Sequence, residues 1–192
     1  SQRSPGETHA GWGRAVKRMP MPMRCVVDTN VATTANRANE GAPASCVVAS
    51  ARALRSLMEG GHVFVDDGGR IVAEYRANLD AKGQPGPGDV FFKWLLTHEW
   101  GVERVSRVRI TPSPDDEEDF KELPTPPEGT VYDRSDRKFL AVAAAHGEHP
   151  PILQSFDSKW WAWGAALAEV GVRIHFLCPA AIAKKYREKM GT

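Results

Sequence analysis

The pattern of hydrophobic and polar positions changes repeatedly along the chain from Arg24 onward. Short apolar or alternating runs are followed by longer segments in which apolar residues recur every three or four positions. The short runs are typical of buried strands, and the longer segments are typical of amphipathic helices. The expected strands are Cys25–Asp28, His62–Asp66, Val102–Ile110, Pro151–Ser155 and Val172–Leu177. The expected helices cover residues 45–59, 71–79, 89–100, 135–146, 158–171 and 179–190.

This alternation of strands and helices predicts an α/β fold with a mostly parallel sheet covered by helices on both faces. Three polar residues stand where helices are expected to begin, namely Ser45, Asp89 and Ser135. Serine and aspartate accept hydrogen bonds from the first backbone N–H groups of a helix. We therefore expect each of the three to cap the helix that it precedes.

The chain is predicted to contain one domain. Residues 1–23 carry Gly, Pro and basic residues without periodicity, which predicts a disordered basic tail, with an RNA-contacting arm as the alternative. Residues 24–192 have the length and pattern of a single domain. Within it, residues 111–130 are acidic and rich in Pro, and we expect them to form an exposed loop inserted into the domain.

Composition adds little about function but bears on location. The formal net charge is +1, which neither requires nor excludes a nucleic acid partner. The cysteines Cys25, Cys46 and Cys178 are odd in number and form no CxxC pair, so we expect buried free thiols and not a disulfide or a zinc site. No apolar run approaches the roughly 18 residues needed to span a bilayer. These features predict a cytoplasmic protein without a membrane segment.

Acidic residues stand at or near the ends of the expected strands. Asp28 ends the first strand, Asp157 follows the strand at Pro151–Ser155, and Asp136 lies in the first turn of a helix. Glu74 lies on the helix that follows the second strand. Because ligands bind at the carboxyl ends of parallel strands, these acids are candidates for one shared cleft. Each also has a simpler interpretation, as a helix cap or a solvated acid.

Several carboxylates in one cleft would repel one another unless cations lay among them. Oxygen donors suit Mg²⁺ or Mn²⁺ better than zinc. Such an ion can activate water and stabilise charge on a phosphodiester, which gives a route to hydrolysis without a Ser, Cys or His nucleophile. Basic residues that flank the acids could hold phosphates or simply be solvated. They are Arg134, Arg137, Lys138 and Lys159.

The segments that contain these acids resemble the PIN domain family in order and spacing. They are "VVDTNV", "VAEYRANL", "DRSDRKFLAVAAAHG" and "LQSFDSKWW", and the resemblance covers roughly residues 24–177. It implies a three-layer α/β/α sandwich with metal-dependent ribonuclease activity, as in toxins of the VapC type. The segment 81–130 is longer and richer in Pro than in compact members of the family.

The resemblance also implies roles for individual residues. The four acids of the family correspond to Asp28, Glu74, Asp136 and Asp157, which would hold Mg²⁺ or Mn²⁺. Asn30 and Ser155 correspond to polar residues that would orient the metals or the attacking water.

Two of these assignments have alternatives. Asp133 can replace or supplement Asp136 as a metal ligand, because it lies nearly one helical turn earlier. Asp66 and Asp67 end the second strand and compete with Glu74 for the role of the second acid.

The function expected from the resemblance is endonucleolytic hydrolysis of single-stranded RNA. It further implies a toxin of a toxin–antitoxin pair, an antitoxin partner and a homodimer. The alternative is a catalytically silent PIN-like module that binds RNA or a protein. A phosphohydrolase of the haloacid dehalogenase type is disfavoured, because such a site needs a second Asp where this chain has Asn30.

Overall fold

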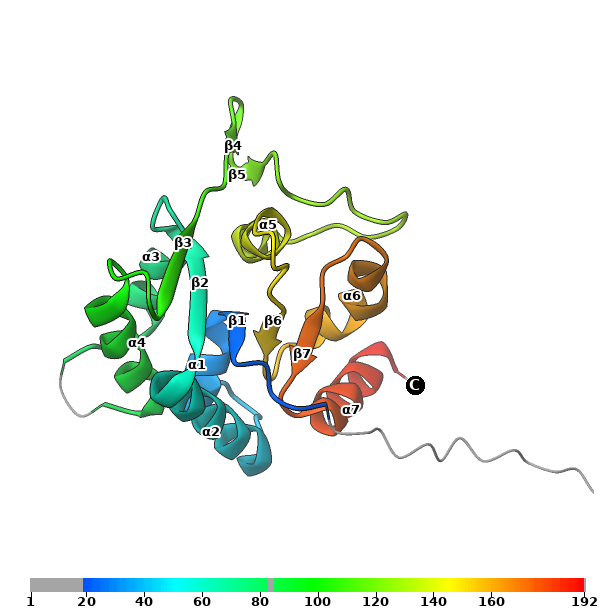
Figure 1. Cartoon of the computed structure of the whole chain (residues 1–192). Helices are drawn as coiled ribbons and strands as arrows, with labels where there is room; N and C mark the ends of the chain where they lie inside the picture. Colours follow the sequence, from blue (N-terminus) through cyan, green and yellow to red (C-terminus); the bar gives the residue numbers. More distant parts are fainter. Residues whose placement is uncertain (1–18, 83–84, 192) are drawn as a thin grey trace, which may run out of the picture.

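The computed structural model describes residues 19–82 and 85–191 (Figure 1). Most of the tail predicted for residues 1–23 therefore lies outside the described residues. The domain begins at the first strand and ends with a helix that reaches Met190.

A parallel sheet of five strands forms the centre of the domain, in the order β3-β2-β1-β6-β7. The central strand pairs with a neighbour on each side, so that Cys25 lies opposite Val63 and Val26 lies opposite Ile152. The three inner strands of the sheet are buried on both faces, which explains why their sequences are nearly continuous apolar runs. The strands are β1 (Arg24–Val27), β2 (His62–Asp66), β3 (Val105–Val108), β6 (Ile152–Gln154) and β7 (Ile174–Phe176).

Helices cover both faces of this sheet (Figure 1). The helices α1 (Thr29–Ala35), α2 (Ala44–Gly60) and α4 (Pro87–His98) contact one another, whereas α5 (Arg137–Ala145) packs against β1, β2 and β6. The expected α/β/α sandwich is confirmed. None of the helices in the described ranges is both long and apolar enough to cross a bilayer. The remaining helices are α3 (Arg70–Asn78), the short 3₁₀ helix η1 (Arg134–Asp136), α6 (Ser158–Glu169) and α7 (Pro179–Met190).

None of the three residues is the N-cap of its helix as expected, although Asp89 does take part in capping α4. Ser45 lies inside α2, which begins after Pro43 without a side-chain cap, and Ser135 lies inside η1. Asp89 lies in the first turn of α4, where its carboxylate accepts a hydrogen bond from Gly86 N at 2.9 Å. A cap depends on the exact residue at which a helix begins, and apolar periodicity fixes that boundary only to within a few residues.

The segment expected to be a loop contains a short hairpin, β4 (Pro112–Ser113) and β5 (Asp116–Phe120). Two interactions hold it to the domain: Phe120 is buried in the core, and Arg134 forms ion pairs with Asp116 and Glu118 at 2.7 Å each. Arg134 of η1 therefore partly neutralises the acidic side chains on which the expectation of a solvated loop was based.

Cys46 and Cys178 form a disulfide, with their Cα atoms 5.4 Å apart. The expectation of free thiols is wrong for these two residues and holds for Cys25, which is free and buried. Cys46 lies in the first turn of α2, and Cys178 directly precedes α7. The fold brings the two helix N-termini together across 132 positions of sequence, a proximity that cysteine spacing alone does not reveal.

We expect the disulfide to contribute strongly to stability, because its loss restores freedom to a long segment of the unfolded chain. Replacing both residues, as Cys46→Ala and Cys178→Ala together, should lower the free energy of unfolding by about 2–5 kcal/mol. The measurement is urea unfolding under oxidising conditions. Dithiothreitol should destabilise the wild type by a similar amount and leave the double variant unchanged. A wild-type midpoint that does not move after complete reduction would contradict this prediction.

Candidate active site

A cleft of about 330 Å³ opens where β1 and β6 end. The four acids assigned from the sequence all line it, although they come from four different parts of the chain: Asp28, Glu74, Asp136 and Asp157. Its other lining residues are mostly small or polar, and they include Thr29, Asn30, Asn39, Ser135 and Lys159. The position agrees with the rule that ligands bind at the carboxyl ends of parallel strands.

Asp28 is the most deeply placed of the four acids. It directly follows β1, and its Oδ1 accepts a hydrogen bond from Asn30 N at 2.8 Å, so it caps α1. Only 4% of its surface is exposed. Burial raises the pKa of Asp28 to about 8, and repulsion from Asp136, Glu74 and Asp157 contributes, although the Asn30 N–H opposes the shift. Asp28 thus serves both as the N-cap of α1 and as a carboxylate of the cleft.

Glu74 lies on α3, which carries it to the cleft opposite α1. Thr29 Oγ1 donates a hydrogen bond to Glu74 Oε1 at 2.7 Å, and the Lys138 ammonium forms an ion pair with the other oxygen. The competing acids lie elsewhere. Asp66 is fully buried and accepts hydrogen bonds from the first N–H groups of α3, whereas Asp67 Oδ1 accepts a long one from Ile110 N at 3.4 Å.

Asp136 ends η1 and is 6% exposed. Its Oδ2 lies 2.6 Å from Lys159 Nζ, which also lies 2.9 Å from Asp133 Oδ2 and 3.7 Å from Asp157 Oδ2. Burial raises the pKa of Asp136 to about 6; the Lys159 ammonium opposes the shift, and the neighbouring carboxylates of Asp157 and Asp133 add to it. Asp133 is exposed and contacts the site through Lys159.

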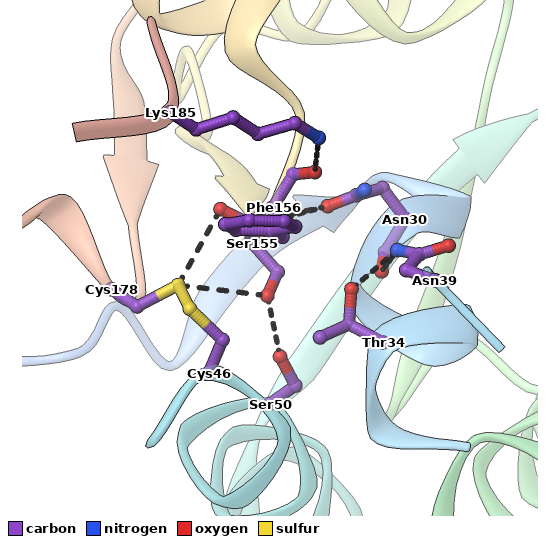
Figure 2. Close-up of a disulfide and its surroundings, with 9 residues drawn as sticks. All are labelled: Asn30, Thr34, Asn39, Cys46, Ser50, Ser155, Phe156, Cys178 and Lys185. Carbon is purple, nitrogen blue, oxygen red and sulfur yellow. Dashed lines mark hydrogen bonds between the residues drawn. A yellow bond between two sulfur atoms is a disulfide. The ribbon is translucent and has the colours of Figure 1, made fainter. Parts of the chain in front are cut away.

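Asn30 and Ser155 support the loop between β6 and α6, as Figure 2 shows. Asn30 Oδ1 accepts hydrogen bonds from Ser155 N at 3.1 Å and Phe156 N at 2.8 Å. The Ser155 hydroxyl is fully buried and shares a hydrogen bond of 2.7 Å with Ser50 Oγ. Asn30 therefore fixes the backbone that leads to Asp157.

The role expected for Ser155 does not fit its position. Its side chain does not line the cleft, because the hydroxyl lies on the side of the loop that faces Ser50 and Cys178. The physical reason is contact with distant segments, because the hydroxyl bonds with Ser50 of α2 in the interior.

Sequence reasoning missed how the bases of the site are used. It gave four bases as residues that could hold phosphates or simply be solvated, whereas each of them forms an ion pair with an acid of the chain itself: Lys138, Lys159, Arg134 and Arg137. It also missed Thr29, the donor to Glu74. The one sequence feature that could have indicated this role is that Thr29 directly follows Asp28 at the end of the strand.

The donor set of the cleft fits a hard divalent cation, because it consists of carboxylate oxygens without His or Cys. Among the described residues, however, no three His, Cys, Asp or Glu side chains are already arranged to share one ion. Two of these carboxylates instead form ion pairs with lysine ammonium groups: Glu74 pairs with Lys138, and Asp136 pairs with Lys159.

No protein-family model, curated protein or solved structure matches this chain. The interpretation of the cleft therefore depends on its own chemistry.

The raised pKa of Asp28 has a consequence for stability. A carboxyl group whose pKa is higher in the folded state stabilises that state below its unfolded pKa, near 3.8, and loses this contribution as the pH rises through about 8. In metal-free buffer, Asp28→Asn should therefore be more stable than the wild type at pH 8.5, by at least about 1 kcal/mol.

The test is urea unfolding of both proteins at pH 5 and pH 8.5 with EDTA present. The difference in unfolding free energy between variant and wild type should increase toward the higher pH. A difference that is the same at both pH values would show that the pKa of Asp28 is not raised in the folded protein.

Proposed function

We propose that this protein is a divalent-metal-dependent ribonuclease of the PIN type. The observation that carries the proposal is the meeting of four carboxylates from separate segments in one cleft at the carboxyl ends of parallel strands. Burial raises the pKa values of two of them, Asp28 and Asp136, and repulsion from neighbouring carboxylates adds to both shifts. A cation of higher charge would relieve this repulsion.

The residues that would hold the ion are Asp28, Asp136 and Asp157, with Glu74 completing the set from the opposite wall. A Mg²⁺ or Mn²⁺ ion bound there supplies activation of water and stabilisation of phosphodiester charge.

Other residues of the chain hold these acids in position. Thr29 directs Glu74 toward the cleft, and Asn30 fixes the loop that carries Asp157. These contacts come from α1, the helix that Asp28 caps.

Further parts of the proposal derive from the resemblance to PIN domains. They are a single-stranded RNA substrate, an antitoxin that covers the cleft, a homodimer and a cytoplasmic location. The disulfide bears on the last of these, because disulfides are uncommon in reducing compartments. Thiol trapping in intact cells measures whether Cys46 and Cys178 are joined where the protein works.

A second candidate function is a catalytically silent module that binds RNA or a protein partner. The ion pairs of Lys138 and Lys159 favour it, since they neutralise acids that a nuclease would need for its metal. The two candidates differ in one measurable property, cleavage of RNA in the presence of Mn²⁺.

We expect Asp28→Asn and Asp136→Asn each to lower RNA cleavage by about 100-fold or more, because each removes a charged donor from the metal site. Cleavage of a labelled single-stranded oligonucleotide is measured with Mn²⁺ and with EDTA. Asp115→Asn is the matched control, since Asp115 is an exposed acid between the hairpin strands. Circular dichroism should show that all three variants are folded.

Two outcomes would contradict the nuclease proposal. One is RNA cleavage that continues in the presence of EDTA and is unchanged in both the Asp28→Asn and the Asp136→Asn variants. The other is the absence of cleavage by folded wild type with any divalent ion, which would support the silent module.

A further inference from the structure

Lys159 lies at the point where the acids of the cleft come closest together. Its Nζ is within 4 Å of three carboxylates, at 2.6 Å from Asp136 Oδ2, 2.9 Å from Asp133 Oδ2 and 3.7 Å from Asp157 Oδ2. These acids come from the segment before α5 and from the start of α6. An ammonium group therefore contacts carboxylate oxygens that a metal ion bound in the cleft would need.

The backbone keeps the lysine at this point. Lys159 lies in the first turn of α6, and its N–H donates to Asp157 Oδ1 at 3.2 Å. Its side chain is 31% exposed, less than half the value of Lys184, which forms a simple surface pair. Three carboxylates within 4 Å favour the charged form of this amine, so Lys159 is present as an ammonium.

We propose that Lys159 is a built-in counter-ion that competes with the divalent metal for the carboxylates of the cleft. The inference rests on the proposed function, because it concerns the same site. A metal ion that used Asp136 would have to share a carboxylate whose Oδ2 Lys159 Nζ contacts at 2.6 Å. The positive charges would repel each other, so the ammonium opposes metal binding there.

This competition accounts for two features of the structure together. The acids are close enough to share one ammonium but are not arranged as a ready-made metal site. Lys159 affects the metal site through its contacts with the acids, so it is a positioning residue and not a catalytic one.

The test is the affinity for Mn²⁺ alone, measured by titration calorimetry at fixed ionic strength and pH 7.5. Lys159→Gln removes the charge and should tighten Mn²⁺ binding about tenfold or more. Lys159→Arg keeps the charge and should bind Mn²⁺ as weakly as the wild type. Lys184→Gln is the control for loss of a lysine ion pair elsewhere, because Lys184 pairs with Glu188 on exposed α7. Thermal melts establish that each variant is folded.

The outcomes separate this inference from the proposed function. If the wild type binds Mn²⁺ and Lys159→Gln binds it no more tightly, the competition is refuted and the metal site stands. If only Lys159→Gln binds Mn²⁺, the competition is supported and the wild-type nuclease is refuted. If no folded variant binds Mn²⁺, both are refuted. Equal tightening by Lys159→Arg would also overturn the inference, since charge would then not be the cause.

Discussion

Burial of neighbouring carboxylates in one cleft is the constraint on which the chemistry of this structure depends. Asp28 and Asp136 are almost completely buried, where an isolated charge is very unfavourable. The protein compensates with backbone N–H groups at helix N-termini and with the ammonium groups of Lys138 and Lys159. The compensation is incomplete, because the pKa values of Asp28 and Asp136 remain raised, by burial first and by neighbouring carboxylates in addition.

Much of the surrounding architecture keeps these groups in place. One helix, α1, begins at Asp28 and carries both Thr29 and Asn30, which reach Glu74 and the loop before α6. The same loop is held from its other side, where Lys185 Nζ donates to Phe156 O at 3.3 Å and lies over the Phe156 ring (Figure 2). A small second core lies beneath it and includes the disulfide: Cys46, Phe156, Cys178 and Ile182. Contacts from α1 and α7 thus hold the loop that carries Asp157.

The fold and the location of the acids could be predicted from the sequence because both follow from local patterns. Continuous apolar runs mark strands buried on both faces, and an acid at the end of such a run is delivered to one edge of a parallel sheet. Side-chain partners and directions could not be predicted in this way. The Cys46–Cys178 bond, the hairpin held by Arg134 and the turn of Ser155 away from the cleft all depend on contacts between distant segments. The pairing of Lys159 with Asp136 is of the same kind.

The most direct test of the central claim, that the four acids form a divalent metal site, is a crystal structure of the protein soaked in Mn²⁺ with anomalous data. We expect an anomalous peak in the cleft at about 2.1 Å from oxygens of Asp28 or Asp136, with Lys159 displaced from Asp136. A fully soaked crystal with no peak in the cleft, and with Lys159 still paired to Asp136, would contradict it.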